Sequence, residues 1–134
     1  MTTEILRGGP EGIARAGEIL RTGGLVAIPT ETVYGLAANA LDPVAVKKIF
    51  EAKGRPGDNP LIVHITEVEQ WAPLVSALPE RALRLAERFW PGPLTIILPK
   101  SDIVPYETSG GLDTVAVRCP SHPAARAVIE AAGV

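Results

Sequence analysis

The chain has 134 residues, of which 46% are hydrophobic and 21% are charged. This length and composition are typical of one globular domain with a sizeable core, and they exclude a disordered or fibrous protein. Thirteen Lys and Arg residues against fifteen Asp and Glu residues give a formal net charge of -2, which argues against bulk attraction to nucleic acid or an anionic membrane. Any bound anion must therefore be recognised by local groups.

The cysteine count and the hydropathy pattern point to a cellular compartment. Cys119 is the single cysteine, which excludes an intramolecular disulfide framework and a cysteine-based zinc site and suits a reducing compartment. No segment approaches the roughly 20 apolar residues of a membrane-spanning helix, and the N-terminus lacks the pattern of a signal peptide. We therefore expect a cytoplasmic protein with no membrane contact.

Glycine and proline, thirteen of each, divide the chain into alternating strand-like and helix-like segments. In the N-terminal half, strands are predicted at 3–6 and 25–28. A helix is predicted to begin at Gly9-Pro10 and to end at Gly23. Its apolar face consists of Ile13, Ala16, Ile19 and Leu20. A second helix has Asp42 as its N-cap, Pro43 in its first turn and an inward stripe of Val46, Ile49 and Phe50, and it stops at Gly54.

In the C-terminal half, strands are predicted at 61–65, 94–98 and 114–117. A polar turn at Thr66 leads into a segment around Trp71 and Leu74. Pro79 is predicted to start an amphipathic helix that ends at 90–93. Its buried face is expected to consist of Leu83, Ala86, Phe89 and Trp90. Ser121 is expected to cap a final helix that runs through Ala132. The alternation predicts the α/β class.

The last residues, Gly133-Val134, stand where an α/β pattern would begin its next strand. We therefore expect residues 1–134 to form a single domain that lacks its C-terminal part. One side of its core would be uncovered, which would make the chain less stable or more prone to association than its length suggests.

Two polar segments are candidates for ligand binding. Residues 29–36, Pro-Thr-Glu-Thr-Val-Tyr-Gly-Leu, follow a predicted strand, where open α/β sheets place their ligands. The simpler interpretation is an ordinary turn with Thr32 capping a helix. Residues 53–60, Lys-Gly-Arg-Pro-Gly-Asp-Asn-Pro, form a stiff loop in which Lys53 and Arg55 could face one anion, with Lys47 and Lys48 just upstream. Alternatively, Lys53 only complements the negative end of the preceding helix.

Strand alternation adds two further candidates. In 114–118 the period of two puts Thr114, Ala116 and Arg118 on the face opposite the two valines. Likewise, Ile62, His64 and Thr66 share a face. A single His or Arg at the end of a strand is usually structural. These residues therefore support a binding site only if they lie close to the 53–60 loop.

Other chemistries find less support. His122 stands at a helix start, where capping is its expected role. No acidic cluster accompanies the two histidines, so we predict no metal site built from protein ligands. No Gly-x-Ser-x-Gly elbow supports a hydrolase triad. Residues 109–111, Ser-Gly-Gly, could form an anion nest, although a flexible surface loop is the simpler interpretation.

Four motifs in this order resemble the YrdC-type L-threonylcarbamoyladenylate synthases. They are residues 29–36, the Lys-x-Arg-Pro-x-x-Asn-Pro-Leu of 53–61, the Trp-Pro-Gly-Pro-Leu-Thr of 90–95, and the Thr-Val-Ala-Val-Arg of 114–118. The resemblance implies a twisted mixed sheet with flanking helices, in the YrdC-like (DHBP synthase-like) architecture, incomplete at the C-terminus. It also implies a nucleotidyltransferase that converts L-threonine, bicarbonate and ATP into threonylcarbamoyl-AMP and pyrophosphate. Partner proteins would then transfer the threonylcarbamoyl group to the adenosine beside the tRNA anticodon.

The resemblance also implies roles for particular residues. The threonine pocket would include Thr32, His64 and Arg118, and ATP would be contacted by Lys53, Arg55, Asn59 and Thr114. Lys53 and Arg55 would be catalytic through charge neutralisation, and Mg²⁺ would come with the nucleotide. The family domain continues beyond this point with a Ser-x-Asn motif and a further arginine.

Two other functions remain open. An RNA-binding module, for tRNA or double-stranded RNA, is conceivable because a basic loop could grip a backbone, but only six aromatic residues argue against a stacking platform. A YrdC-like module of a hydrogenase-maturation carbamoyltransferase would carry preceding acylphosphatase and zinc-finger-like segments, which this sequence lacks.

Overall fold

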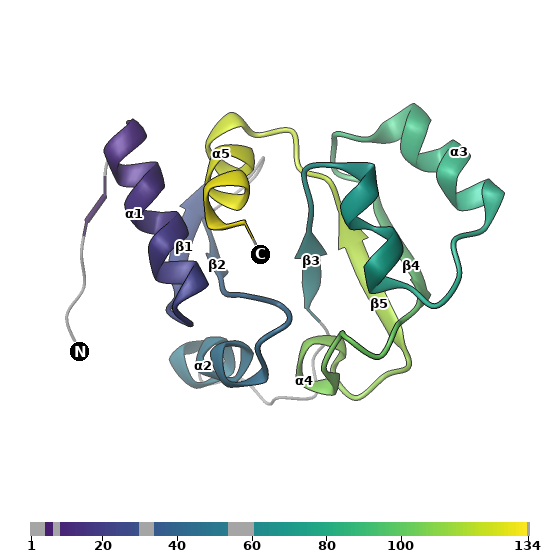
Figure 1. Ribbon diagram of the computed structural model, residues 1–134, viewed down its shortest axis with the longest axis horizontal. Helices are drawn as coiled ribbons and strands as arrows, with labels where there is room; N and C mark the ends of the chain where they lie inside the picture. Colours follow the sequence, from purple (N-terminus) through teal and green to yellow (C-terminus); the bar gives the residue numbers. More distant parts are fainter. Residues whose placement is uncertain (1–4, 7–8, 30–33, 54–60, 134) are drawn as a thin grey trace.

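The computed structural model describes residues 5–6, 9–29, 34–53 and 61–133. Within these ranges the chain forms a mixed α/β fold with two sheets (Figure 1). One sheet pairs β1 (Val26–Pro29) antiparallel with β2 (Tyr34–Ala37). The other has the order β3-β5-β4, in which β3 (Ile62–His64) is parallel and β4 (Thr95–Pro99) antiparallel to the central β5 (Thr114–Arg118). The expected mixed sheet with flanking helices is confirmed.

Helices α1 (Pro10–Arg21) and α5 (Pro123–Ala132) lie side by side next to the β1–β2 sheet (Figure 1). Their contact is close because Gly17 of α1 has no side chain, so that the backbone of Ala131 fits against it. Arg21 at the end of α1 donates to the carbonyls of Ala131 and Ala132, the last of α5. A cation at the negative end of a helix is favourable, so this arginine joins the two helices.

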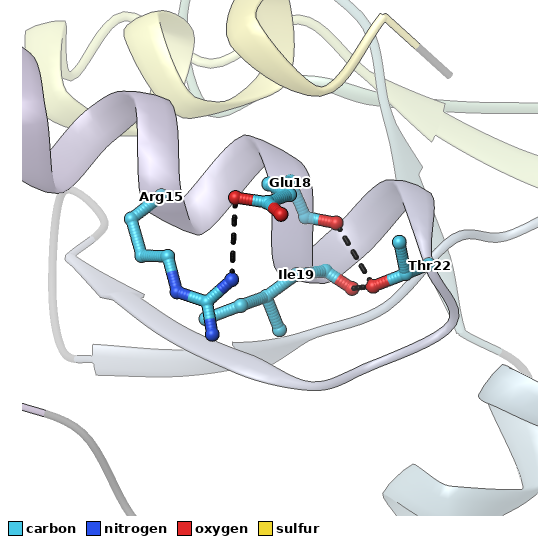
Figure 2. A network of polar contacts seen from close by, with 4 residues as sticks. All are labelled: Arg15, Glu18, Ile19 and Thr22. Atoms are coloured by element: carbon cyan, nitrogen blue, oxygen red, sulfur yellow. Dashed lines mark hydrogen bonds and ion pairs between the residues drawn. The ribbon is translucent and has the colours of Figure 1, made fainter.

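The end of α1 follows the sequence prediction. The Thr22 hydroxyl donates to the carbonyl oxygens of Glu18 and Ile19, at 3.0 and 3.1 Å, and Arg15 pairs with Glu18 on the outer face at 3.2 Å (Figure 2). Gly23 then takes a φ of 89°, which favours glycine. The carbonyls of Glu18 and Ile19, in the last turn of α1, thus accept from the Thr22 hydroxyl in addition to backbone N–H groups.

Helix α2 (Pro43–Lys53) begins as its sequence predicts. The Asp42 carboxylate accepts a hydrogen bond from the backbone N–H of Val44 at 3.0 Å, the geometry of an N-cap. The predicted stripe of Val46, Ile49 and Phe50 is buried.

The main core lies on one face of the β3-β5-β4 sheet. Val63, Val115 and Val117 point into it, and it is completed by Trp71, by the single-turn helix η2 (Ala72–Leu74) and by α3 (Glu80–Phe89). The single-turn helix η1 (Val68–Gln70), which precedes Trp71, has no buried residue. The prediction of a valine face on residues 114–118 is confirmed. Thr66 is an exception to the predicted alternation: β3 ends at His64, and Thr66 beyond it is buried.

Residues 34–37 form a strand rather than the start of a helix, while Thr32, the alternative helix cap, lies outside the described residues. Pairing with β1 places Ala37 opposite Val26 and Gly35 opposite Ile28, which satisfies backbone groups of both strands. Valine and tyrosine at 33–34 of the sequence favour a strand, but the polar residues before them favour a turn.

A short helix, α4 (Tyr106–Ser109), precedes the surface loop expected at 109–111 and includes its first residue, while Gly110 and Gly111 form a turn after the helix. Thr108 and Ser109 are buried. The Thr108 hydroxyl donates to the Ala40 carbonyl, and the Thr108 carbonyl accepts from the N–H of Leu61 at 2.9 Å. Thr108 can be buried because distant backbone groups provide its partners, whereas the Ser109 hydroxyl donates to the Tyr106 carbonyl within the same helix.

Two local predictions are wrong in detail. Phe89 is exposed, because the buried stripe of α3 follows Ala82 and Ala86 to Trp90, and Phe89 lies about 100° round the helix from Trp90. His122, rather than Ser121, caps α5: its side chain accepts from the N–H of Ala124 at 3.1 Å. The capping role predicted for His122 is confirmed.

The predicted strand at 3–6 falls largely outside the described residues, and Ile5 and Leu6 form no regular secondary structure. Among the described helices, none is both long and apolar enough to cross a bilayer.

Candidate functional site

The face of the β3-β5-β4 sheet opposite the main core carries the polar candidates. The strand register places His64 of β3 beside Arg118 of β5, and Arg118 beside Thr95 of β4. These three side chains therefore form one row across the sheet. Ile62, Ala116 and Ile97 form the next row along the strands. The convergence of His64 and Arg118 follows from the parallel pairing of two strands more than 50 residues apart in sequence.

The Arg118 guanidinium is held against Thr95. Nε and Nη2 both donate to the Thr95 hydroxyl oxygen, at 2.9 and 2.7 Å. The side chain is half-buried. Arginine has five N–H donors, so after these two bonds it retains donors on Nη1 and Nη2 for a planar anion.

His64 is oriented by its own strand. Its Nδ1 lies 3.1 Å from the carbonyl oxygen of Ile62, and since a carbonyl can only accept, Nδ1 donates in this contact. In the neutral ring this leaves Nε2 as the acceptor. His64 also lines the cavity described next.

A cavity of about 530 Å³ lies between the two sheets. Strands β2 and β3 and helices α2, α4 and α5 contribute to its wall, which is mainly apolar. The polar side chains in the wall belong to Asn39, His64, Gln70 and Thr108. Apolar clefts with a few polar groups are typical of small-molecule sites, and His64 connects this cleft to the row that holds Arg118.

Thr114 shares the face of β5 with Arg118, as predicted. It lies at the other end of the strand, roughly 13 Å away at the usual rise per residue. The structure thus places one candidate threonine contact and one candidate ATP contact on the same surface without bringing them together.

The remaining candidates lie outside the described residues. They are Thr32, Arg55, Asn59 and the side chain of Lys53, whose backbone ends α2. The two lysines upstream have structural partners: Lys48 donates to the carbonyl of Gly23 at 2.8 Å, and Lys47 lies 3.8 Å from Glu107.

Arg126 of α5, which the sequence analysis passed over, holds the ends of β3 and β5 together. Its guanidinium donates to the carbonyls of Thr66 and Pro120, at 3.0 and 2.9 Å, and contacts the Cys119 sulfur at 3.2 Å. No sequence pattern indicated this role, because the partners come from two segments, at Thr66 and at 119–120, that are more than 50 residues apart in the chain.

Charge and metal chemistry elsewhere do not point to a second site. Within the described ranges, no three side chains among His, Cys, Asp and Glu gather in a way that could hold a metal ion. The hydrogen bond and negative charge of Asp113 raise the pKa of Tyr106 above 10.0, but Tyr106 is an exposed residue of α4 away from the His64–Arg118 row.

Residues 18–134 match the family model Sua5_yciO_yrdC, described as telomere recombination. The chain belongs to this family. It is 64% identical over 115 residues to the threonylcarbamoyl-AMP synthase of Pyrococcus abyssi and 53% identical over 135 residues to that of Bacillus subtilis. These alignments cover 86% and 100% of the chain but 34% and 39% of the two relatives. The chain therefore spans little more than a third of the length of these family members.

The fold also matches a solved family structure. P. abyssi Sua5 complexed with L-threonine superposes with a TM-score of 0.90 at 58% identity, over 97% of this chain and 38% of that one. The family and the architecture predicted from the four motifs are thereby confirmed.

Proposed function

We propose that this chain forms the substrate-binding part of a threonylcarbamoyl-AMP synthase, with L-threonine held by Arg118 and His64. The observation that carries the proposal is the register of β3 on β5, which puts an oriented arginine beside an oriented histidine at the edge of an apolar cavity. Arginine suits a carboxylate because its donors match the two oxygens. The relative in P. abyssi was solved with L-threonine.

In the reaction proposed, the amino nitrogen of L-threonine forms a bond to the carbon of bicarbonate and water leaves, which gives N-carboxy-threonine. Its new carboxylate oxygen attacks the α-phosphorus of ATP. The bond from that phosphorus to the oxygen bridging the α- and β-phosphates breaks, and pyrophosphate leaves. Such a transfer requires positioning and charge neutralisation more than a nucleophilic side chain. Thr114, Lys53, Arg55 and Asn59 would contact ATP, and Mg²⁺ would arrive on its phosphates as part of the substrate.

The product would pass to proteins that transfer the threonylcarbamoyl group to the adenosine beside the tRNA anticodon. We place this chemistry in the cytoplasm, in keeping with a single buried cysteine and with ATP as a substrate.

The proposal is tested by incubating the chain with magnesium ATP, L-threonine and bicarbonate. Mass spectrometry should detect threonylcarbamoyl-AMP that depends on L-threonine, together with released pyrophosphate. Arg118→Met should raise the KM for L-threonine by roughly ten- to hundredfold, because a hydrogen bond to a charged group is lost. Arg84→Met is a matched control, since Arg84 pairs with Glu80 on the exposed face of α3.

The product should be absent when L-threonine is omitted. If the folded chain forms no product and calorimetry detects no L-threonine binding, the proposal is wrong for this chain. The RNA-binding alternative remains a prediction, and tRNA affinity that falls steeply with salt would support it.

A further inference from the structure

The Thr95 hydroxyl occupies one edge of the Arg118 guanidinium. A guanidinium can bind a carboxylate bidentately through the edge formed by Nε and one Nη, or through the edge formed by Nη1 and Nη2. In this structure the Nε–Nη2 edge is occupied by the Thr95 hydroxyl, with bonds of 2.9 and 2.7 Å. Bidentate binding is therefore left to the Nη1–Nη2 edge.

The segment before Thr95 is fixed to β5. The N–H of Gly92 donates to the carbonyl of Cys119, the residue after Arg118, at 2.8 Å. The Trp90 indole N–H donates to the carbonyl of Leu94 at 2.8 Å. Gly92 is suited to this turn because a Cβ there would lie 2.8 Å from the Phe89 carbonyl oxygen. The Trp-Pro-Gly-Pro-Leu-Thr motif thus anchors the start of β4 beside the end of β5.

The antiparallel register completes the arrangement. Thr95 is the first residue of β4 and pairs with Arg118 of β5. Its neighbour Ile96 points into the core. Thr95 is half-buried, and a hydroxyl that accepts two N–H bonds from one guanidinium limits rotation of the whole arginine side chain.

We propose that Thr95 is a positioning residue, which presents the Nη1–Nη2 edge of Arg118 to the carboxylate of the amino-acid substrate. This inference rests on the proposed function, because it takes the ligand to be L-threonine. It assigns to the Trp90–Thr95 motif the task of preparing the arginine before the substrate arrives. Such preorganisation lowers the ordering cost of binding.

The test compares Thr95→Val, which keeps the shape and removes the hydroxyl, with Thr95→Ser, which keeps the hydroxyl. In NMR spectra, the Arg118 Nε–H signal, identified by its loss in Arg118→Lys, should exchange with solvent at least tenfold faster in Thr95→Val. In Thr95→Ser the exchange rate should stay within about twofold of the unsubstituted chain.

Calorimetry supplies the second measurement. Thr95→Val should weaken L-threonine binding by roughly tenfold and reduce the preference for L-threonine over L-threonine amide, whereas Thr95→Ser should preserve both. A general loss of structure would weaken both ligands equally and leave that preference unchanged. Equal urea midpoints for the two variants check that both are folded.

Unchanged Nε–H exchange in Thr95→Val, or unchanged affinity and preference, would overturn the inference alone. If the unsubstituted chain binds no L-threonine, the proposed function fails and the role of Thr95 in substrate binding fails with it. Measuring L-threonine binding by the unsubstituted chain therefore distinguishes the two failures.

Discussion

Gly17→Ala is expected to destabilise the chain, although alanine is the better helix former. A Cβ built on Gly17 would lie 2.6 Å from the carbonyl carbon of Ala131 and 2.8 Å from the nitrogen of Ala132. Both neighbours are backbone atoms of α5 and have no rotamer by which to withdraw. The two helices would have to separate, which would also disturb the contact of Arg21 with the last carbonyls of α5.

Two opposing effects set the magnitude. Replacing glycine by alanine inside a helix favours folding by about 1 kcal/mol. Forcing an extra carbon into a packed contact costs about 1–3 kcal/mol, and more where the neighbour is backbone. The steric cost dominates here, so we expect a net loss of about 1–2 kcal/mol in the free energy of unfolding.

Urea denaturation followed by circular dichroism measures the change. Ala14→Gly, on the exposed face of α1, is the matched control and should cost about 1 kcal/mol through helix propensity alone. If Gly17→Ala raised the urea midpoint, helix propensity would outweigh the contact, and the close approach of α1 and α5 would be refuted.

Two further predictions concern Arg126 and Tyr106. Arg126→Met should lower the free energy of unfolding in urea by about 2 kcal/mol, because it removes the guanidinium donor from the carbonyls of Thr66 and Pro120. Arg84→Met should change this free energy by less than about 0.5 kcal/mol. Equal effects of the two substitutions would contradict the role of Arg126 in joining the ends of β3 and β5. Asp113→Asn should lower the pKa of Tyr106 towards 10.0, because the carboxylate that favours the neutral phenol is removed. Absorbance at alkaline pH, with Tyr106→Phe to assign the signal, measures this pKa. Since the folded-state pKa of Tyr106 is raised, the contact with Asp113 stabilises the fold at pH values below the ordinary tyrosine pKa. This stabilisation is lost as the pH rises through the raised pKa. An unchanged titration of Tyr106 in Asp113→Asn would contradict the hydrogen bond.

Local patterns in the sequence were enough to predict the four longer helices, α1, α2, α3 and α5. Asp42-Pro43 starts α2, and the spacing of Val46, Ile49 and Phe50 gives the face that is buried. These features depend on residues within a few positions of each other, so the chain encodes them directly. The four motifs identified the family for the same reason: each is a short run that can be read without knowing its neighbours in space.

The predictions that failed depend on distant partners. Ser109 is buried because the short helix α4 packs near the start of β3, and Phe89 is exposed because the tertiary contact of α3 follows a different helical row. Neither the burial of Ser109 nor the exposure of Phe89 could be predicted from neighbouring residues. A polar segment resembles a loop until its partners are known, and an apolar residue at the end of a helix can belong to the buried or to the exposed face.

Short-range spacing in the sequence was therefore sufficient to predict the family, the four longer helices and the valine face of β5. Tertiary structure alone decided that β5 lies between β3 and β4 in a register that aligns His64, Arg118 and Thr95. The physical reason is that strand pairing joins residues far apart in the chain, and a shift of one residue would turn each side chain to the opposite face.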